Sequence, residues 1–239
     1  MSHRYYCAVD PEKVLTVGEE HPLDEKESHH ALHVMRVKPG DPIELFDGCG
    51  NEFEATIVAT QRKQVTVQIT AQHAVSRELS HPLIVAIPIP KADRQKFLVE
   101  KLTELGVTRL LFIDTERSSV QCNEKTISKL ARLVIESSKQ CRRNHLMEIS
   151  FGGNLPELAR SMQSDSYQGY IKRFAHPAMS DPSLPHNPCP SVILIGPEGG
   201  LSGEEVDLLQ QLDWECLDLG QTILRMETAA VAATVLLRN

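Results

Sequence analysis

Short apolar and alternating runs, separated by turn-forming residues, fill the first third of the chain. Alternation of apolar and polar residues is typical of strands with one buried face. Strands are predicted at residues 4–9, 43–46, 53–59 and 65–69. The segment 47–51, Asp-Gly-Cys-Gly-Asn, has the composition of a hairpin turn between two of them. We therefore expect a small β-barrel over residues 1–72, with one helix at 24–37 that Pro39 and Gly40 terminate.

The pattern changes after residues 73–80, which carry few apolar side chains and are predicted to be a linker. From residue 81 to 239, short apolar runs alternate with runs of helical periodicity. The predicted strands are 83–89, 110–113, 167–171, 192–195 and 216–219, and the predicted helices are 94–105, 124–141, 202–212 and 224–237. Ser202 and Glu205 have the spacing of a capping box. Strands that alternate with helices favour an α/β domain with a mostly parallel sheet.

The composition is that of a soluble globular protein, with 41% hydrophobic and 24% charged residues among 239. No stretch approaches the roughly 18 apolar residues that span a membrane, and residues 1–7 lack the apolar core of a secretory signal. We therefore expect a cytoplasmic protein. The six cysteines show no C-x-x-C spacing and no histidine pair at ligand spacing, so we expect reduced thiols and no metal site.

The net charge of −7 is unevenly distributed along the chain. Lys and Arg counted against Asp and Glu give −5 for residues 1–72, +4 for residues 73–150 and −6 for residues 151–239. Binding to phosphates depends on the charge at the contact surface rather than on the total. The locally basic middle segment therefore keeps a nucleic-acid partner open.

Two segments combine a strand, a glycine-bearing loop and the start of a helix. They are 193–202, Ile-Leu-Ile-Gly-Pro-Glu-Gly-Gly-Leu-Ser, and 217–230, Leu-Asp-Leu-Gly-Gln-Thr-Ile-Leu-Arg-Met-Glu-Thr-Ala-Ala. Ligands of open α/β sheets bind beyond the carboxyl ends of the strands, where glycines let them approach the backbone. Each segment is therefore a candidate ligand loop. An ordinary Gly-Pro turn would explain the first equally well, and neither is a dinucleotide fingerprint or a P-loop.

Charged side chains in three further places are candidates for chemistry. Arg225 and Glu227 are predicted in the first turn of the last helix, where a cation is unfavourable for the helix dipole. Arg225 is therefore a functional candidate, with an inert surface pair as the alternative. The basic runs 91–96 and 139–144 are explained either by solvated helix faces or by contacts to phosphates.

Taken together and in this order, the motifs resemble the bacterial 16S ribosomal RNA uracil-N3 methyltransferases, a family of the SPOUT class. The segments that carry the resemblance are 91–94, 104–107, 115–118, 140–143, 196–200 and 219–229. Residues 4–6, 29–37 and 39–41 are similar to the PUA-like RNA-binding domain of that family. The match covers nearly the whole chain, and the stretch 160–190 matches weakly.

The resemblance implies a PUA-like β-barrel followed by a SPOUT α/β domain, with a C-terminal trefoil knot at about residues 190–239. It implies S-adenosyl-L-methionine as the cofactor, held between the loops 196–200 and 219–224. It also implies a homodimer, for which 192–195 and 228–237 offer apolar surface, and 16S ribosomal RNA or the small ribosomal subunit as the partner. The expected cofactor-binding residues are Leu194, Ile195, Gly196, Pro197, Glu198, Gly199, Gly200, Leu219, Gly220, Ile223, Leu224, Thr228 and Ala229.

The implied reaction is methyl transfer to N3 of a specific uridine, with Arg225, Glu198 and Glu227 as the catalytic candidates. Arg225 is expected to stabilise the uracil anion at its oxygen edge. Either glutamate could accept the N3 proton or orient Arg225. The expected RNA contacts are Arg4, His30, Arg36, Lys91, Arg94, Arg117, Arg142 and Arg143.

Three other functions are compatible with parts of the sequence. One is a SPOUT methyltransferase that acts on another RNA base or on a ribose 2′-hydroxyl. A second is a non-catalytic RNA-binding ribosome assembly factor, against which the intact motifs 196–200 and 219–229 argue. The third, a serine or cysteine hydrolase, has little support because no Gly-x-Ser-x-Gly elbow is present.

Overall fold

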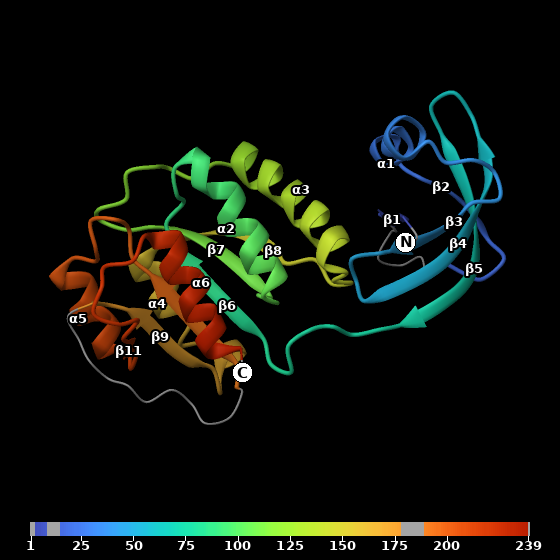
Figure 1. Cartoon of the computed structure of the whole chain (residues 1–239). Helices are drawn as coiled ribbons and strands as arrows, with labels where there is room; N and C mark the ends of the chain where they lie inside the picture. The colour runs from blue at the N-terminus through green and yellow to red at the C-terminus, as the bar shows by residue number, and fades with distance from the viewer. Residues whose placement is uncertain (1–2, 9–14, 178–188, 239) are drawn as a thin grey trace. The chain divides into compact units, whose positions relative to one another are not determined.

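The computed structural model describes residues 3–8, 15–177 and 189–238. The chain forms two compact units, Met1–Glu78 with Ser138–Leu146, and Leu79–Ser137 with Met147–Asn239. Figure 1 shows the order of the elements along the chain. The sequence did not indicate that Ser138–Leu146 belongs with the first unit. The last residue of the first predicted strand, Val9, lies outside the described residues.

The first unit contains a five-stranded sheet in the order β1-β3-β4-β5-β2. Its strands are β1 His3–Tyr6, β2 Glu20–Pro22, β3 Pro42–Phe46, β4 Asn51–Thr60 and β5 Val65–Ala74. β1 is parallel to β3, and the other neighbours are antiparallel. Each of the four predicted strands overlaps a strand of this sheet, and the turn at 47–51 is confirmed, but β1 ends at Tyr6, before the predicted end at residue 9. The short β2 was not predicted. Among the described residues the two outer strands, β1 and β2, do not pair with each other.

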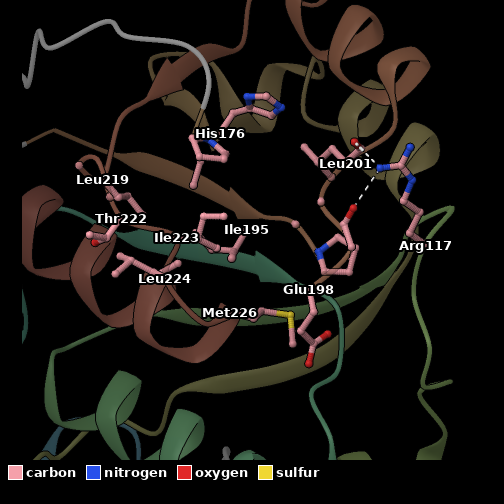
Figure 2. A pocket seen from close by; sticks show the side chains of 18 residues that line it. Arg117, His176, Ile195, Glu198, Leu201, Leu219, Thr222, Ile223, Leu224 and Met226 are labelled. Carbon is pink, nitrogen blue, oxygen red and sulfur yellow. Dashed lines mark hydrogen bonds between the residues drawn. The ribbon is translucent and has the colours of Figure 1, made fainter.

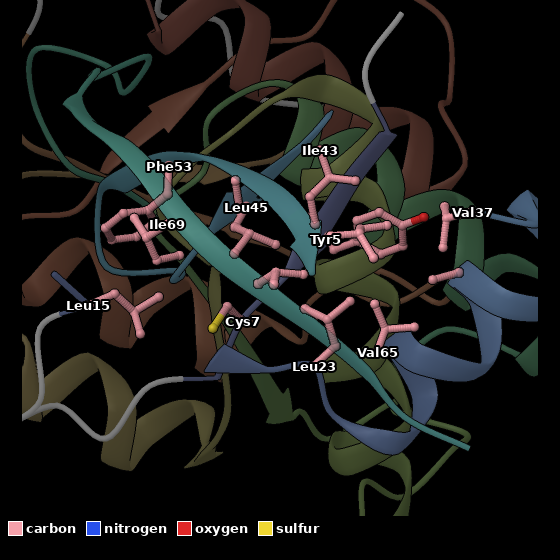
Figure 3. Close-up of a cluster of buried hydrophobic side chains, with 14 residues drawn as sticks. Tyr5, Cys7, Leu15, Leu23, Val37, Ile43, Leu45, Phe53, Val65 and Ile69 are labelled. Atoms are coloured by element: carbon pink, nitrogen blue, oxygen red, sulfur yellow. The ribbon is translucent and has the colours of Figure 1, made fainter. Parts of the chain in front are cut away.

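Alternate positions of these strands share one hydrophobic core (Figure 3). Every second residue is buried over 53–57 on β4 and over 65–69 on β5. Tyr5 from β1 and Leu45 from β3 belong to the same cluster. This period of two is that of strands with one face toward a core. It is the alternation from which the strands were predicted.

The predicted helix at 24–37 begins as expected but changes geometry along its length. The Asp24 side chain accepts a hydrogen bond from the backbone N–H of Glu27 over 2.7 Å and caps α1, Glu25–His29. The chain continues as a π-helical turn, His30–Met35. Arg36 ends this turn with a φ of +56°, in the left-handed region where helices commonly stop. Arg36 is therefore outside the helix, and it is exposed.

The second unit contains a six-stranded sheet in the order β11-β9-β10-β6-β7-β8, in which every neighbouring pair is parallel. Its strands are β6 Leu83–Ile87, β7 Arg109–Asp114, β8 Glu148–Asn154, β9 Ile171–Ala175, β10 Ser191–Ile195 and β11 Glu215–Leu217. The helices of this part of the chain are α2 Ala92–Glu104, α3 Glu124–Cys141, α4 Leu155–Ser161, α5 Gly203–Gln211 and α6 Met226–Leu237. The predicted α/β domain with a parallel sheet is confirmed. Within the described ranges, no helix has both the length and the apolar character needed to cross a membrane.

Helices cover both faces of this sheet. α6 packs against α2 and against strands β6 and β10, and Figure 1 shows α2 and α6 next to each other. A separate core against the sheet includes Leu158 of α4, Leu209 of α5 and Trp214. The run Val192–Ile195 of the central β10 is at most 2% exposed. This run is therefore not the dimer surface that the sequence led us to expect, because the subunit itself covers it.

Several elements of the second unit differ from the prediction. The strand expected at 167–171 is wrong, because Asp165–Tyr167 is a 3₁₀ turn and β9 begins only at Ile171. The strand β8 was missed because it contains two glycines and its residues do not alternate between buried and exposed positions. The seven-residue α4 was missed because it is too short for a clear helical period, although a capping box begins it. The last helix begins at Met226, so Arg225 is its N-cap and lies before the first turn.

Candidate cofactor pocket and active site

A cavity of about 390 Å³ lies beyond the carboxyl ends of three neighbouring strands, β9, β10 and β11. Parallel strands bring these ends to one edge of the sheet, which is where α/β proteins bind ligands. The volume is within the range of small-molecule sites. Figure 2 shows the residues that line it: Arg117, Ala175, His176, Pro177, Ile195, Gly196, Pro197, Glu198, Gly199, Gly200, Leu201, Leu219, Gly220, Thr222, Ile223, Leu224, Met226 and Ala229.

The loop after β10 folds back on itself closely enough to favour glycine. A Cβ atom added to Gly196 would lie 3.1 Å from Cγ of Leu201, which is tighter than ordinary contacts. Gly200 has a φ of +71°, which L side chains rarely adopt, and its N–H donates to the carbonyl of Pro197 over 2.9 Å. The predicted capping box then starts α5. The glycines of this segment thus form a tight turn at the cavity wall.

Arg117, which lies far from this loop in the sequence, donates hydrogen bonds to its backbone. Its Nη1 donates to the carbonyl oxygens of Gly199 over 3.0 Å and Leu201 over 3.4 Å, as Figure 2 shows. Arg117 was predicted to contact RNA. In the structure it lines the cavity, and its partners are two carbonyls of the glycine loop. Arg117 therefore stabilises the conformation of the glycine loop.

The loop after β11 supplies another wall of the cavity. Gly220 has a φ of +104°, and its N–H donates to Oδ1 of Asp218 over 2.8 Å. Ile223 is 90% exposed, and it lines the cavity together with Leu224 and Met226. Met226 is already buried, so a ligand in the cavity would mainly cover Ile223 and Leu224 and remove them from water, which is favourable.

The two loops predicted from the sequence meet at this cavity. All the predicted cofactor residues line it except Leu194, which is buried in the sheet, and Thr228, which is exposed on α6. The residues that the sequence missed are Ala175, His176, Pro177, Leu201, Thr222 and Met226. The first of these, Ala175, ends β9, and the next two follow it, whereas the strand predicted from the sequence ended at residue 171. A correct end for that strand would have identified them.

Two of the three predicted catalytic residues share one partner, Arg94 of the first turn of α2. Its Nη1 lies 3.4 Å from Oε1 of Glu198, and its Nε lies 3.6 Å from Oε1 of Glu227. The Glu198 side chain is 40% exposed and lines the cavity. The Glu227 side chain is only 8% exposed and does not line the cavity. Arg94 was predicted as an RNA contact, and its observed partners are these two carboxylates.

Arg225, the third catalytic candidate, is the N-cap of α6. Its backbone is extended, with φ −65° and ψ 152°, and its side chain makes no capping hydrogen bond. The side chain is exposed, and both of its chain neighbours, Leu224 and Met226, line the cavity. Arg225 itself is not among the residues that line the cavity, and its side chain does not maintain the helix start.

Similarity to known proteins identifies the family. An RNA methyltransferase domain matches residues 77–238, and an RNA methyltransferase PUA domain matches residues 23–70. The chain belongs to the RNA methyltransferase family. The resemblance that the motifs predicted is thereby confirmed, as is a PUA-like domain followed by a methyltransferase domain.

Individual relatives agree with this assignment along the whole chain. The ribosomal RNA small subunit methyltransferase E of Bacillus subtilis is 29% identical over 225 residues, which cover 87% of this chain and 85% of the relative. A putative methyltransferase from Legionella pneumophila, solved with bound cofactor SAM, is 30% identical with a TM-score of 0.89, covering 99% of this chain and 97% of that one. A ribosomal RNA small subunit methyltransferase E from Neisseria gonorrhoeae, bound to S-adenosyl methionine, is 26% identical with a TM-score of 0.88, covering 98% and 96%.

Two of the RNA contacts predicted for this RNA methyltransferase are buried in its first unit. The Arg4 side chain is 5% exposed, with Nε 3.3 Å from Oε1 of Glu44 and Nη2 3.6 Å from Oε2 of Glu52. Burial lowers the pKa of the Arg4 guanidinium from its ordinary value, and the two carboxylates oppose this shift. The Arg143 side chain is 4% exposed and lies 2.6 Å from Oε2 of Glu78. Since both cations are buried and paired, the structure argues against contacts from them to phosphates.

The other predicted RNA contacts of the RNA methyltransferase differ in accessibility. Arg36 and Lys91 are exposed. The Arg142 side chain is 50% exposed although it pairs with Glu44. His30 is half-buried, and its ring lies 6.0 Å from the ring of Tyr5 in an edge-on packing contact. Arg36, Lys91 and Arg142 are therefore the predicted residues best placed to reach an RNA backbone.

The structure offers no candidate metal centre in the residues that it describes, since no three His, Cys, Asp or Glu side chains gather there. The six cysteines are free thiols. The absence of a metal from the reaction remains a prediction.

Proposed function

We propose that the protein is an S-adenosylmethionine-dependent methyltransferase that modifies N3 of a specific uridine in 16S ribosomal RNA. The observation that carries this proposal is the single cavity shared by two glycine loops, 196–200 and 219–224, that are separate in the sequence. The names of the relatives support a small-subunit ribosomal RNA substrate, and two solved relatives hold the cofactor. We also propose that the enzyme works in the cytoplasm, where this RNA is made.

The residues around the cavity fit this cofactor. The apolar side chains of Ile195, Leu224 and Met226 suit the faces of an adenine ring. The backbone of the glycine loops supplies N–H and C=O groups for the polar edge of that ring. When bound, S-adenosylmethionine supplies a methyl group that its sulfonium already activates. The protein then has to position the uridine and remove the proton from N3.

Positioning and charge stabilisation are the contributions of the chain itself. Holding the reacting groups in contact lowers the activation free energy by about 7–11 kcal/mol. N3 faces the partner base in a pair, so the uridine has to be unpaired or flipped out. We expect the exposed Arg225 to bring its cation to the negative charge that develops on the uracil oxygens. Either Glu198 or Glu227 receives the N3 proton. The other possible role of a glutamate is to orient the cation of Arg225.

The test of this function is methyl transfer to two substrates, purified 16S RNA and the assembled small subunit, with the modified nucleoside identified by mass spectrometry. N3-methyluridine in either substrate is the expected product. A product methylated on a ribose 2′-hydroxyl or on another base would replace the proposal with a different specificity. Binding of RNA with neither methyl transfer nor cofactor binding would indicate an assembly factor.

As finer parts of this proposal, we assign the chain to the SPOUT class, with a trefoil knot at about residues 190–239. We also propose that the PUA-like sheet closes into a barrel. The course of the chain supports the knot: after β11, at the edge of the sheet, α6 returns to pack against β10 and β6. The loops that follow β10 and β11 border one cavity. An experimental density map in which the chain reaches α6 without passing through another loop would contradict the knot.

We also propose that the enzyme is a homodimer that buries part of α6 and α2. Val235 is 43% exposed and Leu236 is 38% exposed on α6, and Phe97 is 45% exposed on α2, against which α6 packs. Val235→Glu should raise the dimer dissociation constant by about 100-fold or more, because a carboxylate would be buried without a partner. Analytical ultracentrifugation measures this constant. Phe151→Glu, at a residue 47% exposed on β8, is the matched control, and equal effects of both changes would contradict the interface.

For RNA binding we expect Arg36, Lys91 and Arg142 to contact phosphates. Each alanine substitution should reduce the slope of log affinity against log salt concentration by about one unit. Fluorescence anisotropy with a fragment of small-subunit RNA between low and moderate salt measures the slope. Arg160→Ala, at an exposed residue of α4, is the control. Unchanged slopes in all three variants would place the RNA surface elsewhere.

A further inference from the structure

Arg94, Glu198 and Glu227 form a charged cluster to which three separate elements contribute. Arg94 comes from the first turn of α2, Glu198 from the glycine loop after β10, and Glu227 from the first turn of α6. The guanidinium lies 3.4 Å from Glu198 and 3.6 Å from Glu227, both measured to Oε1. One cation thus connects the glycine loop to the start of the last helix.

The burial of Glu227 gives it a supporting role in this cluster. Its side chain is 8% exposed, and its Oε2 is shielded from solvent with no hydrogen-bond partner among the described residues. A buried carboxylate is costly unless an opposite charge compensates it. Arg94 is the only cation paired with it in the described part of the chain. Because Glu227 does not line the cavity, its position suits the anchoring of Arg94 better than contact with a substrate base.

Glu198 has the opposite environment. It lines the cavity, and 40% of its side chain is exposed. Figure 2 shows it among the residues that line the cavity, which also include Met226. Arg94 engages Oε1, and within the described residues no hydrogen-bond donor reaches Oε2. One carboxylate oxygen is therefore fixed, and the other is open to a group that enters from solvent.

We infer that Glu198 is the catalytic residue that accepts the N3 proton, and that Arg94, anchored by Glu227, is a positioning residue that fixes the Glu198 carboxylate. The inference rests on the proposed function. In this step the N3–H bond breaks and its proton moves to Oε2 of Glu198. The electron pair on N3 forms the bond to the methyl carbon, and the bond from that carbon to sulfur breaks with its electrons left on sulfur. The carboxyl group afterwards returns the proton to water.

The experiment compares Glu198→Gln, Glu227→Gln, Arg94→Met, Arg94→Lys and the double variant Arg94→Met with Glu227→Gln. The matched control is Lys96→Met, on the same helix at a side chain that is 69% exposed. For each variant we would measure kcat and KM for small-subunit RNA, the cofactor dissociation constant by calorimetry, and the free energy of unfolding in urea. The last two readouts do not depend on catalysis.

Glu198→Gln should lower kcat by about 100-fold or more, the contribution of a general base, while KM and cofactor affinity change less than about 3-fold. Glu227→Gln and Arg94→Met should each lower kcat by about 10-fold, and the double variant should be no slower than either, since both act through Glu198. Arg94→Lys should recover part of the loss. The double variant should also lose less stability than the sum of the two single changes, because each single change already breaks the same ion pair between Arg94 and Glu227.

Three results would each overturn the inference: a larger loss of kcat in Glu227→Gln than in Glu198→Gln, additive losses in the double variant, or an Arg94→Met enzyme that behaves like Lys96→Met. The proposed function fails separately, if the unsubstituted enzyme binds no cofactor or makes no N3-methyluridine. An active enzyme with the wrong order of variants therefore rejects the roles of these residues and leaves the reaction standing.

Discussion

Replacing Arg225 with alanine is expected to lower the rate of methyl transfer by about 100-fold or more while the affinity for S-adenosylmethionine stays near its original value. The side chain is exposed, and it belongs to a residue whose two chain neighbours line the cavity. A cation at this place can stabilise the anion on the uracil oxygens, which exists only once N3 loses its proton. The effect should therefore appear in kcat more than in binding. Single-turnover methyl transfer and calorimetry measure the two quantities.

The structure also predicts that this substitution leaves the fold intact. Arg225 is the N-cap of α6, but its side chain makes no capping hydrogen bond, so alanine removes no support from the helix. Arg225→Lys should retain part of the rate, because the charge is kept and only the forked geometry is lost. Near-normal turnover by Arg225→Ala would remove this residue from the mechanism. A collapse of cofactor affinity would give it a binding role instead.

The positions of the two glycine loops that line the cavity could be predicted from the sequence because their signals are local. A buried strand followed directly by glycines and a helix start places a loop at the carboxyl edge of a sheet. The segments 196–200 and 219–224 follow this pattern, and the structure brings them to one cavity. Ala175, His176 and Pro177, which also line the cavity, were missed for an equally local reason. The segment 167–171, with two tyrosines and an isoleucine, resembles a strand, but a 3₁₀ turn ends at Tyr167 and β9 begins only at Ile171, so the end of β9 was misplaced.

The partners of the charged residues could not be predicted, because they lie far away in the sequence. Arg4 pairs with Glu44 and Glu52 inside the first unit, although its sequence context resembles an RNA-binding motif. Arg94 reaches residues more than 100 positions later. An arginine that binds phosphate and one that holds a carboxylate look alike in a sequence. The difference between them is burial, which depends on the whole fold.

The contacts of Arg117 with the glycine loop predict that Gly199→Val lowers the cofactor affinity. A Cβ at residue 199 would lie 3.4 Å from Cβ and 3.5 Å from Cδ of Arg117, which is ordinary contact, so Gly199→Ala should bind the cofactor almost normally. The two γ-methyl groups of valine have no such room. They would displace Arg117 from the carbonyls of Gly199 and Leu201 and narrow the cavity that these residues line. Calorimetry should show S-adenosylmethionine affinity lowered by about 10-fold or more, equivalent to about 1.4 kcal/mol.

Gly203→Val is the control variant. It separates the local effect at residue 199 from any general effect on cofactor affinity of placing a β-branched residue in this part of the chain. Gly203 is the first residue of α5, it does not line the cavity, and a Cβ there meets no atom within 4 Å. Its cofactor affinity should therefore remain unchanged, although only a few positions separate it from Gly199. If Gly199→Val binds the cofactor as tightly as Gly203→Val does, the backbone of this loop does not form the cofactor site. The cavity that the loops 196–200 and 219–224 both line would then have a purpose other than cofactor binding.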